Sequence, residues 1–467
     1  MNLLESLRAA VGPRYLLTAD EDTAPFLTDW RRRFVGRALA VALPADTAQA
    51  SAVVACCAAA GVPVIPQGGN TGLVGGGTPD ASASAVLIST RRMKRVRAID
   101  ADNDTITVEA GCTLLEVQQA AAQEGRLFPL SLAAEGSATI GGNLSTNAGG
   151  TQVLRYGNAR ELALGLEVVL PDGRVWNGLR GLRKDNTGYD LKQLFIGAEG
   201  TLGLICAATL RLYPMPKAQR TALAALPSLQ AAVRLLRRLR ADAGPALTAF
   251  EVMAGSCLQV VERAFPDRRR PFAQVPAWTA LLELSDHESD AHAVATLERA
   301  LGEALEAGEI QDAAVAQSEA DSLAFWRLRE SIPEAQSKLG GNVKNDISLP
   351  VSRIPAFVES TNARLAALHD WIEPVVFGHL GDGNLHYNMG ARPGCDPRLP
   401  FDHEEEIHAL VNEAVAAADG SISAEHGIGQ LKREALARYK SAVELDAMRA
   451  IKRALDPNGR FNPGRIL

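Results

Sequence analysis

Apolar runs in the first half of the chain alternate between short β-type stretches and longer stretches with helical spacing. Residues 48–60 form an Ala- and Val-rich helical pattern that ends at Gly61, and β-type runs lie before it at 38–43 and after it at 62–66. A strand, a helix and a strand in this order predict a βαβ unit. The same patterns predict a helix at 113–125 and strands at 86–88, 105–111, 161–170, 174–176 and 204–212.

The pattern changes after the Pro-Met-Pro segment at 214–216, which is the most natural linker and domain boundary in the chain. Ala-, Leu-, Arg- and Glu-rich helices and intervening strands follow, and this alternation predicts a second domain of α+β type with an antiparallel sheet. A β-hairpin at 375–390 is expected to belong to that sheet. The helices are expected at 226–242, 290–308, 402–418 and before Asp456, and the strands at 248–253 and 279–284.

A pair of histidines flanks the turn of the predicted hairpin. The Asp-Gly pair at 382–383 is a strong two-residue turn signal between apolar runs. If it forms the turn centre, His379 and His386 stand directly opposite each other with Cβ atoms about 5 Å apart. Two imidazoles at that separation can hold a divalent metal, with Glu425 as a third, oxygen ligand. His426 is then a candidate base beside a metal-bound substrate.

The neighbours of this motif are interpreted separately. Asn388 lies two residues beyond His386 on the same strand face, so it is a candidate polar contact of the site. A hydrogen-bonded surface or core role is expected for the histidines outside the motif: His287, His292, His369, His403 and His408.

Composition and charge limit the possible functions. The chain has 467 residues, enough for two or three domains, and its net charge of −6 provides no large basic field for nucleic acid. Six cysteines without a C-x-x-C pair indicate neither a zinc ribbon nor a dithiol redox site, and they fit buried thiols in a reducing cytosol. No secretory leader is evident, and no apolar run approaches the roughly 20 residues of a membrane span, so a cytoplasmic location is expected.

Residues 66–77 form a glycine-rich loop directly after a predicted strand. Glycines let backbone N–H groups approach an anion closely, and Asn70 and Thr71 add side-chain donors. The loop is neither a Walker A motif, since no Gly-Lys pair occurs in the chain, nor a G-x-G-x-x-G motif. Taken alone, it is equally consistent with a phosphate-binding loop and with a glycine-rich surface loop.

Two further segments favour a large ligand. Residues 131–150 consist mainly of small and hydroxyl side chains, a composition that predicts neither a core helix nor a packed strand. So long a segment in a globular domain usually wraps a ligand. Residues 197–203 are likewise rich in glycine and small side chains, and they precede a predicted strand. Three such segments suit a ligand with many polar atoms, such as a dinucleotide.

These three segments, together with residues 156–157, 184–191 and 461–465, resemble the FAD-linked oxidase family built on the vanillyl-alcohol-oxidase fold. The histidine hairpin and residues 424–427 resemble its D-2-hydroxy-acid dehydrogenase branch, which includes D-2-hydroxyglutarate and D-lactate dehydrogenases. The resemblance covers nearly the whole chain in order. It implies an α+β protein in three parts: a two-subdomain FAD-binding domain at 1–216, a cap domain with an antiparallel sheet at 217–414, and a segment at 415–467 that returns to the FAD domain.

The resemblance also implies how FAD is held. Family members that bind FAD covalently usually carry a histidine in the first glycine loop, and this loop has none, so non-covalent FAD is expected. The implied FAD contacts lie in the glycine-rich segments and near the C-terminus: Pro66, Gly68, Gly69, Asn70, Thr71, Gly72, Leu73, Gly136, Ser137, Thr139, Gly142, Asn143, Asn147, Gly149, Tyr156, Gly157, Glu199, Gly200, Ile205 and Asn462.

A reaction centre is implied by the same resemblance. His426 matches the catalytic base of the family, and Arg329 and Lys344 match cations that contact the substrate. Arginine suits a carboxylate because its guanidinium offers a bidentate fork. The metal ligands, with Zn²⁺ as the expected ion, match His379, His386 and Glu425.

The expected reaction is oxidation of a D-2-hydroxy acid by hydride transfer to flavin N5. D-2-hydroxyglutarate is the first candidate because Arg329 and Lys344 offer two cationic anchors. The D-2-hydroxyglutarate enzymes that the chain resembles carry a hydroxyl residue soon after the arginine, where this chain has Ser331, Ile332 and Pro333. If Pro333 takes that place, one donor to the distal carboxylate is missing, so D-lactate or a glycolate-like acid is the alternative. A non-catalytic flavin-binding subunit of a redox complex and a structural protein without a cofactor stay open as other classes. The expected partners are an electron acceptor, either an electron-transfer flavoprotein or a quinone, and a second copy of the chain in a homodimer.

Overall fold

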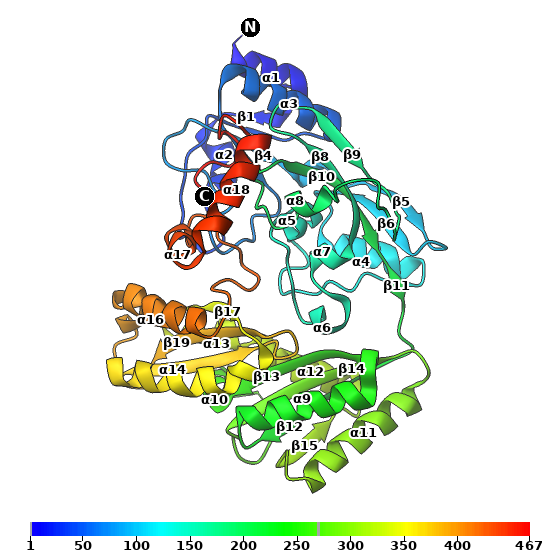
Figure 1. Ribbon diagram of the computed structural model, residues 1–467, viewed down its shortest axis with the longest axis vertical. Helices are drawn as coiled ribbons and strands as arrows, with labels where there is room; N and C mark the ends of the chain where they lie inside the picture. The colour runs from blue at the N-terminus through cyan, green and yellow to red at the C-terminus, as the bar shows by residue number, and fades with distance from the viewer. Residues whose placement is uncertain (1, 269–270) are drawn as a thin grey trace. The chain divides into compact units, whose positions relative to one another are not determined.

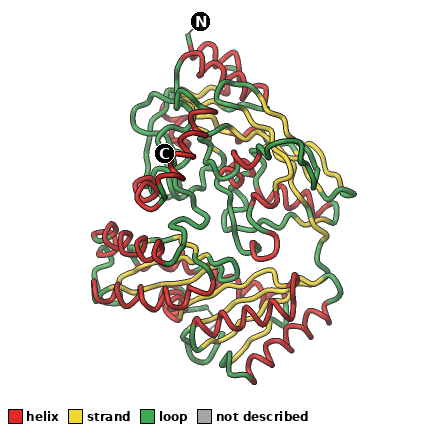
Figure 2. Tube along the Cα trace, viewed as in Figure 1, coloured by secondary structure: helices red, strands yellow, loops and turns green. Residues whose placement is uncertain are grey.

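The chain forms two compact units in the computed structural model, which describes residues 2–268 and 271–467 (Figure 1). The first unit comprises the chain up to Gly149, Gly157–Met215 and Glu425–Leu467, and the second comprises Gly150–Tyr156 and Pro216–Ala424. Each unit contains both helices and strands (Figure 2). The division after Met215 lies inside the Pro-Met-Pro segment. The expected boundary after residue 414 differs from the structure, because it lies inside helix α16, Glu404–Ala417, and the chain divides after Ala424 instead.

One sheet of the first unit contains the predicted βαβ connection. Helix α3 (Thr47–Ala60) joins its strands β2 and β3, with Asp46 capping the first turn and Gly61 ending the helix in the left-handed region at φ 72°. Apolar side chains of α3 and of α1 (Leu3–Val11) pack with the sheet. Strand β4 is parallel to both of its neighbours. The strand order is β1 (Leu16–Leu17), β2 (Ala40–Ala42), β4 (Val86–Ser89) and β3 (Val64–Gln67).

A second sheet of the first unit is antiparallel. Its strand order is β5 (Val96–Asp100), β6 (Thr105–Glu109), β10 (Leu204–Arg211), β8 (Ala163–Val169) and β9 (Val175–Gly178). A separate pair joins β7 (Arg126–Leu127) and β11 (Tyr213–Pro214). The helices here are α2 (Asp20–Leu27), α4 (Leu114–Gln123), α5 (Ile140–Ser145), α7 (Ala159–Leu162) and α8 (Lys192–Phe195).

Helix α5 corrects the interpretation of residues 131–150. The prediction that this segment forms no packed helix is wrong over Ile140–Ser145, where Ile140 and Leu144 are buried. Small side chains are what allow the packing, because a Cβ at Gly141 would lie 2.7 Å from the Cβ of Ala110. A composition without large apolar residues therefore permits a buried helix where two backbones approach closely.

The C-terminal segment belongs to the first unit. It contains α17 (Arg433–Tyr439) and α18 (Ala442–Leu455), and α18 begins with a capping box between Ser441 and Glu444. The chain then runs beside β3: Val64 N–H donates to the Arg460 carbonyl at 2.9 Å. Asn462 N–H in turn donates to the Val64 carbonyl at 2.8 Å.

The second unit is built on an antiparallel sheet, which confirms the predicted α+β architecture. The hairpin strands belong to this sheet, as expected, because β18 pairs with β13. Strand β17 (Asp346–Ser348) pairs with β19 beside the main path. The strand order is β15 (Asp312–Val315), β12 (Ala218–Leu226), β14 (Trp278–Asp286), β13 (Leu247–Ala254), β18 (Ile372–Gly378), β19 (Asn384–Ala391) and β16 (Asn342–Val343).

Helices pack on both faces of this sheet, because alternate strand residues point to opposite sides. Ala222 and Ala224 pack in one core with α9 (Leu229–Ala243), α11 (Asp290–Glu306), α14 (Ile354–Leu368) and α16. Leu223 and Ala225 pack in the other core with α10 (Gly255–Ala264), α12 (Glu319–Glu330) and α13 (Ile332–Leu339). The short helices α6 (Val153–Tyr156) and α15 (Leu399–Asp402) complete the unit.

The hairpin differs from the prediction in its register. His386 pairs with Phe377 rather than with His379, and the connection between the strands consists of residues 379–383. Both Asp382 N–H and Gly383 N–H donate to the His379 carbonyl, at 3.2 and 3.1 Å. The predicted two-residue turn is therefore wrong. His379 lies in a five-residue connection, 379–383, and its carbonyl accepts the hydrogen bonds that close this connection.

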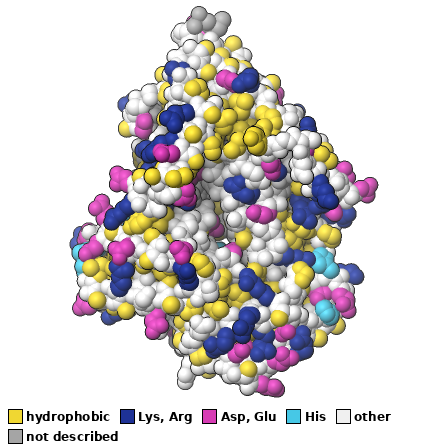
Figure 3. Space-filling model, viewed as in Figure 1, with side chains coloured by type: hydrophobic (Ala, Val, Ile, Leu, Met, Phe, Trp, Pro, Cys, Tyr) yellow, Lys and Arg dark blue, Asp and Glu magenta, His cyan; other side chains and the backbone are white. Residues whose placement is uncertain are grey.

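The surface carries charges of both signs, and the helices are those of a protein without a predicted membrane span. Acidic and basic side chains are interspersed on the visible faces of both units (Figure 3). Within the described part of the chain, no helix combines the length and the apolar character that crossing a membrane requires.

Candidate active site

A cavity of about 320 Å³ lies in the first unit, where the glycine-rich segments meet. The end of β3 and the loop after it contribute residues 66–78, and the segment around α5 contributes residues between 132 and 149. Residues between 199 and 205 form another part of the wall, and Glu425 and His426 line it as well. The structure thus brings together four segments that are far apart in the sequence.

Most of the expected FAD contacts line this cavity: Pro66, Gly68, Gly69, Asn70, Thr71, Gly72, Leu73, Thr139, Gly142, Asn143, Gly149, Glu199, Gly200 and Ile205. The others lie outside its lining in the described part of the chain: Gly136, Ser137, Asn147, Gly157, Asn462 and Tyr156, the last of which belongs to the second unit. Asn462 contacts two residues of the cavity wall, because its Nδ2 donates to the carbonyls of Gly76 at 3.0 Å and Glu199 at 2.7 Å.

Polar atoms in the cavity wall suit a cofactor. Thr78, Thr90 and Thr139 each present a buried hydroxyl oxygen without a hydrogen-bond partner among the described residues, and Asn143 presents an amide nitrogen in the same state. Buried polar groups are otherwise almost always paired, so these atoms are suited to bind a polar ligand. The donor set fits the many oxygen and nitrogen atoms of FAD.

Glycines in the first loop are required by close packing. A Cβ at Gly69 would lie 1.9 Å from the Ser137 carbonyl oxygen, and one at Gly68 would lie 2.3 Å from Thr139 Oγ1. Gly72 is different, since a Cβ there would meet no atom of the described residues within 4 Å. The first two glycines therefore bring two wall segments together, whereas Gly72 leaves open space beside the cavity.

Glu199 holds the C-terminal segment against this wall. Its carboxylate accepts hydrogen bonds from Ile428 N–H and Gly429 N–H, both at 2.7 Å. Burial raises the pKa of Glu199, and the two backbone hydrogen bonds oppose this shift. Because residues 428 and 429 directly follow the turn that carries His426, Glu199 positions that turn as well as lining the cavity.

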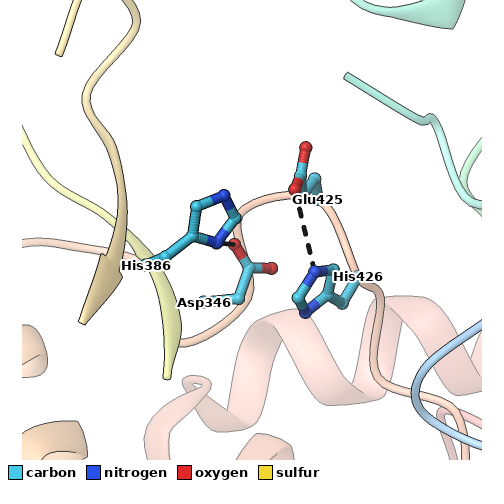
Figure 4. Close-up of side chains that lie close together, drawn as sticks. All are labelled: Asp346, His386, Glu425 and His426. Atoms are coloured by element: carbon cyan, nitrogen blue, oxygen red, sulfur yellow. Dashed lines mark ion pairs between the residues drawn. The ribbon is translucent and has the colours of Figure 1, made fainter. Parts of the chain in front are cut away.

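Glu425 and His426 come from this held segment. His426 Nε2 lies 3.7 Å from Glu425 Oε1, and each side chain is about a quarter exposed, at 22% and 24%. Figure 4 shows the two side chains on the same loop, joined by the ion pair between His426 Nε2 and Glu425 Oε1. They place one imidazole and one carboxylate at the wall of the expected FAD cavity.

Glu251 organises the predicted site residues of the second unit. It lies on β13, is fully buried, and accepts a hydrogen bond from Arg329 Nε at 2.8 Å. Its other oxygen forms a short hydrogen bond with His379 Nδ1. Burial by itself opposes ionisation, but His379 and Arg329 outweigh it and lower the pKa of Glu251 to about 2. Glu251 is therefore an ionised carboxylate that two expected site residues share.

The sequence analysis missed Glu251. The available signal was a charged residue inside the apolar strand predicted at 248–253. A buried carboxylate needs a partner, but the strand pattern does not say which one.

The two motif histidines lie together despite the altered register. The ring centroids of His379 and His386 are 5.6 Å apart in an edge-on arrangement. His379 Nδ1 is bonded to Glu251, which assigns Nε2 as the nitrogen that would bind a metal. A carboxylate that orients a histidine in this way is typical of metal-ligand histidines.

Asp346 is a second acidic neighbour that the sequence analysis missed. It lies on β17, pairs with His386 in the sheet, and places Oδ1 4.0 Å from His386 Nδ1 (Figure 4). Asp346 also accepts a hydrogen bond from Asn384 Nδ2 at 3.0 Å. Its carbonyl accepts the Ala424 N–H at 3.3 Å, and Ala424 directly precedes Glu425 in the chain.

The expected substrate cations have different surroundings. Arg329 is buried, and its guanidinium stacks 4.6 Å above the Phe377 ring while Nε binds Glu251. Because Nε is the guanidinium nitrogen that binds Glu251, the two terminal nitrogens are the ones that would bind a carboxylate ligand. Lys344 is half-buried and lies between β16 and β17, next to Asn345, whose Nδ2 donates to the Tyr387 carbonyl.

The remaining predictions concern Asn388 and Pro333. Asn388 lies on β19 and donates from Nδ2 to Gln336 Oε1 at 3.0 Å. Pro333 lies in the first turn of α13, where backbone N–H groups have no partner within the helix, so a proline costs no hydrogen bond there. The structure therefore gives Pro333 a helix-starting role.

Family comparison identifies both halves of the chain. Residues 38–178 match the family model described as "FAD binding domain", and residues 215–466 match the one described as "FAD linked oxidases, C-terminal domain". The chain is 38% identical to the D-2-hydroxyglutarate dehydrogenase of Xanthomonas citri pv. viticola, over 99% of this chain and 96% of that protein. It is also 38% identical to the mitochondrial D-2-hydroxyglutarate dehydrogenase of Bos taurus, over 98% of this chain and 82% of that protein.

Comparison with solved structures supports the architecture. The crystal structure of p-cresol methylhydroxylase with substrate bound matches 99% of this chain and 96% of its own, with a TM-score of 0.73 and 16% identity. At this level of identity the likeness concerns the fold alone. The predicted α+β fold of vanillyl-alcohol-oxidase type is thereby confirmed.

Proposed function

This chain belongs to the family of FAD-linked oxidases, and from this premise we propose that it is an FAD-dependent dehydrogenase of D-2-hydroxy acids, with D-2-hydroxyglutarate as its first substrate. The observation that carries the proposal is the buried carboxylate of Glu251, which hydrogen-bonds both to His379 and to Arg329. His379 is the proposed metal ligand, and Arg329 is the proposed ligand of a substrate carboxylate. Near-full-length relatives named D-2-hydroxyglutarate dehydrogenase support the choice of substrate.

Oxidation of a 2-hydroxy acid removes a proton from the hydroxyl oxygen and a hydride from the adjacent carbon. Bound FAD supplies the hydride acceptor at flavin N5. His426 is the proposed base for the hydroxyl proton, and Glu425 lies 3.7 Å from its Nε2, so the carboxylate stabilises the protonated imidazole.

A divalent metal, for which Zn²⁺ is our choice, completes the proposed centre. The residues proposed to hold it are His379, His386 and Glu425, a nitrogen and oxygen ligand set that zinc accepts. When bound, such an ion lowers the pKa of the substrate hydroxyl. The hydrogen bond from His379 Nδ1 to Glu251 fixes the tautomer that this role needs.

Two cations suit a substrate with two carboxylates. The guanidinium fork of Arg329 can bind one carboxylate through two parallel hydrogen bonds, and burial against Phe377 makes that interaction stronger than it is in water. We assign the second carboxylate of D-2-hydroxyglutarate to Lys344. D-lactate is the second candidate, because Pro333, in the first turn of α13, has no hydroxyl to offer a distal carboxylate.

Anaerobic mixing of the purified flavoprotein with single hydroxy acids tests the proposal. We expect D-2-hydroxyglutarate to bleach the flavin faster than D-lactate, and both L-enantiomers to leave it oxidised. Faster bleaching by D-lactate would select the second candidate, and bleaching by L-acids alone would contradict the assignment to D-acids. A yellow protein that no hydroxy acid bleaches would indicate the alternative class, a non-catalytic flavin subunit.

The biological setting is also part of the proposal. We propose a cytoplasmic homodimer that passes its electrons to an electron-transfer flavoprotein or to a quinone. Reoxidation of the reduced enzyme by each acceptor, followed in separate anaerobic mixing experiments, distinguishes the two acceptors.

A further inference from the structure

Two histidines and one glutamate meet on the surface of the second unit, apart from the residues assigned to the proposed reaction. His369 follows α14, His403 lies between α15 and α16, and Glu406 lies in the first turn of α16. His369 Nε2 lies 3.0 Å from Glu406 Oε2, and His403 Nδ1 lies 3.3 Å from the same oxygen. The three potential ligand atoms all lie within 4.8 Å of one another.

These separations are close to those between the ligands of a metal ion. Zinc binds histidine nitrogen and carboxylate oxygen at about 2.1 Å, so two ligands of a tetrahedral site lie about 3.4 Å apart. The two nitrogen-to-oxygen distances at Glu406 are 3.0 and 3.3 Å. A metal ion could therefore replace the two imidazole protons with only small movements of the side chains.

The histidine rings are held in place by a buried tryptophan. The ring of His369 stacks on Trp371 with centroids 5.2 Å apart and planes 25° apart, and the ring of His403 lies 5.6 Å from the same side chain. Trp371 itself is only 8% exposed. Rings fixed by packing lose less conformational freedom when they bind a ligand, so this cluster is preorganised.

The electrostatic surroundings also favour a cation. Glu404, Glu405 and Glu406 form the acidic first turn of α16. The side chains of His369 and His403 are 21% and 34% exposed, so an ion can reach them from solvent. A hydrogen-bonded surface role is the expectation for these histidines one by one, but their convergence on a single oxygen is additional information that only the structure contains.

We propose that His369, His403 and Glu406 bind a divalent transition-metal ion of the zinc and copper type. The ligand set of two imidazoles and one carboxylate leaves a fourth position for water. The ion would tie the segment that enters β18 to the start of α16, and so stabilise the second unit. This site is separate from the proposed catalytic metal, and the proposal does not depend on the identity of the substrate.

Zinc titration of the FAD-loaded protein tests the site. We expect His369→Ala and His403→Ala each to bind one zinc ion fewer per chain than the unsubstituted protein. Glu406→Gln keeps the shape of the side chain and should weaken this binding by about tenfold or more. His292→Ala is the matched control, because His292 is another surface histidine paired with a carboxylate, Asp286, and should leave the number of bound ions unchanged.

Copper quenching gives an independent readout. Cu²⁺ should quench part of the tryptophan fluorescence of the unsubstituted protein and of His292→Ala, and this part should be lost in His403→Ala and in Trp371→Phe. Unchanged circular dichroism and flavin content show that each variant is folded. Unchanged zinc stoichiometry in both His369→Ala and His403→Ala, with unchanged quenching, would overturn the proposal.

Discussion

Arg329 donates a hydrogen bond of 2.8 Å from Nε to the buried carboxylate of Glu251. The second oxygen of that carboxylate accepts from His379 Nδ1, so one ionised group orients both an expected substrate ligand and an expected metal ligand. Removing one member of a buried charge pair leaves the other member unpaired, which destabilises a protein more than the pair itself stabilises it. Glu251 should therefore matter for binding and for stability together.

Glu251→Gln should keep the side-chain volume and lose the charge that holds Arg329 and His379. We expect affinity for the metal to fall on the order of 10–100-fold, because the orienting carboxylate of a ligand histidine is weakened. The value of kcat/KM should fall with it, while FAD content should not change, since the FAD cavity lies in the first unit. Steady-state kinetics, metal analysis and flavin absorbance measure these three effects.

Glu283→Gln is the matched control for this experiment. Glu283 is a buried glutamate on the neighbouring strand β14, and it accepts a hydrogen bond from Trp326 Nε1 at 2.9 Å. Burial raises its pKa, whereas the pKa of Glu251 is lowered to about 2. The neutral substitution should be tolerated at position 283. Equal losses of activity in both variants would contradict the specific role of Glu251.

Glu199→Ala should release the segment that carries His426. The change removes two hydrogen bonds to backbone N–H groups, each worth roughly 0.5–3 kcal/mol across the neutral and charged forms of the acceptor. We expect kcat to fall by a larger factor than the affinity for FAD, because many other residues form the cavity wall. Glu116→Ala is the control, since Glu116 accepts the Thr113 N–H at 2.7 Å in the same unit and does not line the cavity. A proportional loss of FAD affinity and kcat would instead indicate a cofactor contact alone.

His426→Ala should remove the proposed base and leave FAD binding intact. General base catalysis contributes about 10²- to 10⁴-fold, so kcat should fall by a factor in this range. The pH dependence of kcat should also lose the limb that reports ionisation of the base. Substitution of His287, which contacts Arg155 on the surface, should leave both properties unchanged. An unchanged kcat in His426→Ala would exclude this residue as the base.

Treatment with a chelator should abolish turnover reversibly without releasing FAD. The expected reason is that the metal acts on the substrate hydroxyl, whereas FAD is held by the glycine-rich segments. Added Zn²⁺ should restore activity equally in the unsubstituted protein and in His403→Ala, because the surface histidine site lies outside the proposed reaction centre. Turnover that is indifferent to the chelator would contradict a catalytic metal.

Thiol labelling should separate the six cysteines by burial. Cys395 is exposed and Cys56 is half-buried, whereas the others are buried. Burial raises the pKa of Cys57, Cys206 and Cys257 to about 12, which suppresses the reactive thiolate near neutral pH. We expect one rapidly labelled thiol in the native protein, lost in Cys395→Ser, and six after denaturation. Rapid labelling of the buried cysteines in the native protein would contradict this expectation and show that the cores open readily.

The local elements were predictable because their signals are local. Helix α3 follows from an Ala and Val pattern that Asp46 and Gly61 delimit, and the antiparallel strands follow from their apolar runs. The glycine-rich segments indicated a large polar ligand for the same reason, since small side chains are visible residue by residue, and the resemblance to FAD-linked oxidases implied that this ligand is FAD. The packed helix at Ile140–Ser145 was missed because its stability comes from close backbone approach rather than from large apolar side chains.

The sequence by itself therefore determined the class of fold, the cofactor-binding segments and the histidine motif. The tertiary structure decided which charges meet: Glu251 with His379, 128 positions apart, and Glu199 with Ile428, 229 positions apart. It also set the hairpin register, in which His386 faces Phe377. Periodicity and turn signals describe neighbours along the chain, whereas the partner of a buried charge depends on how distant strands and loops pack, and no local pattern contains that information.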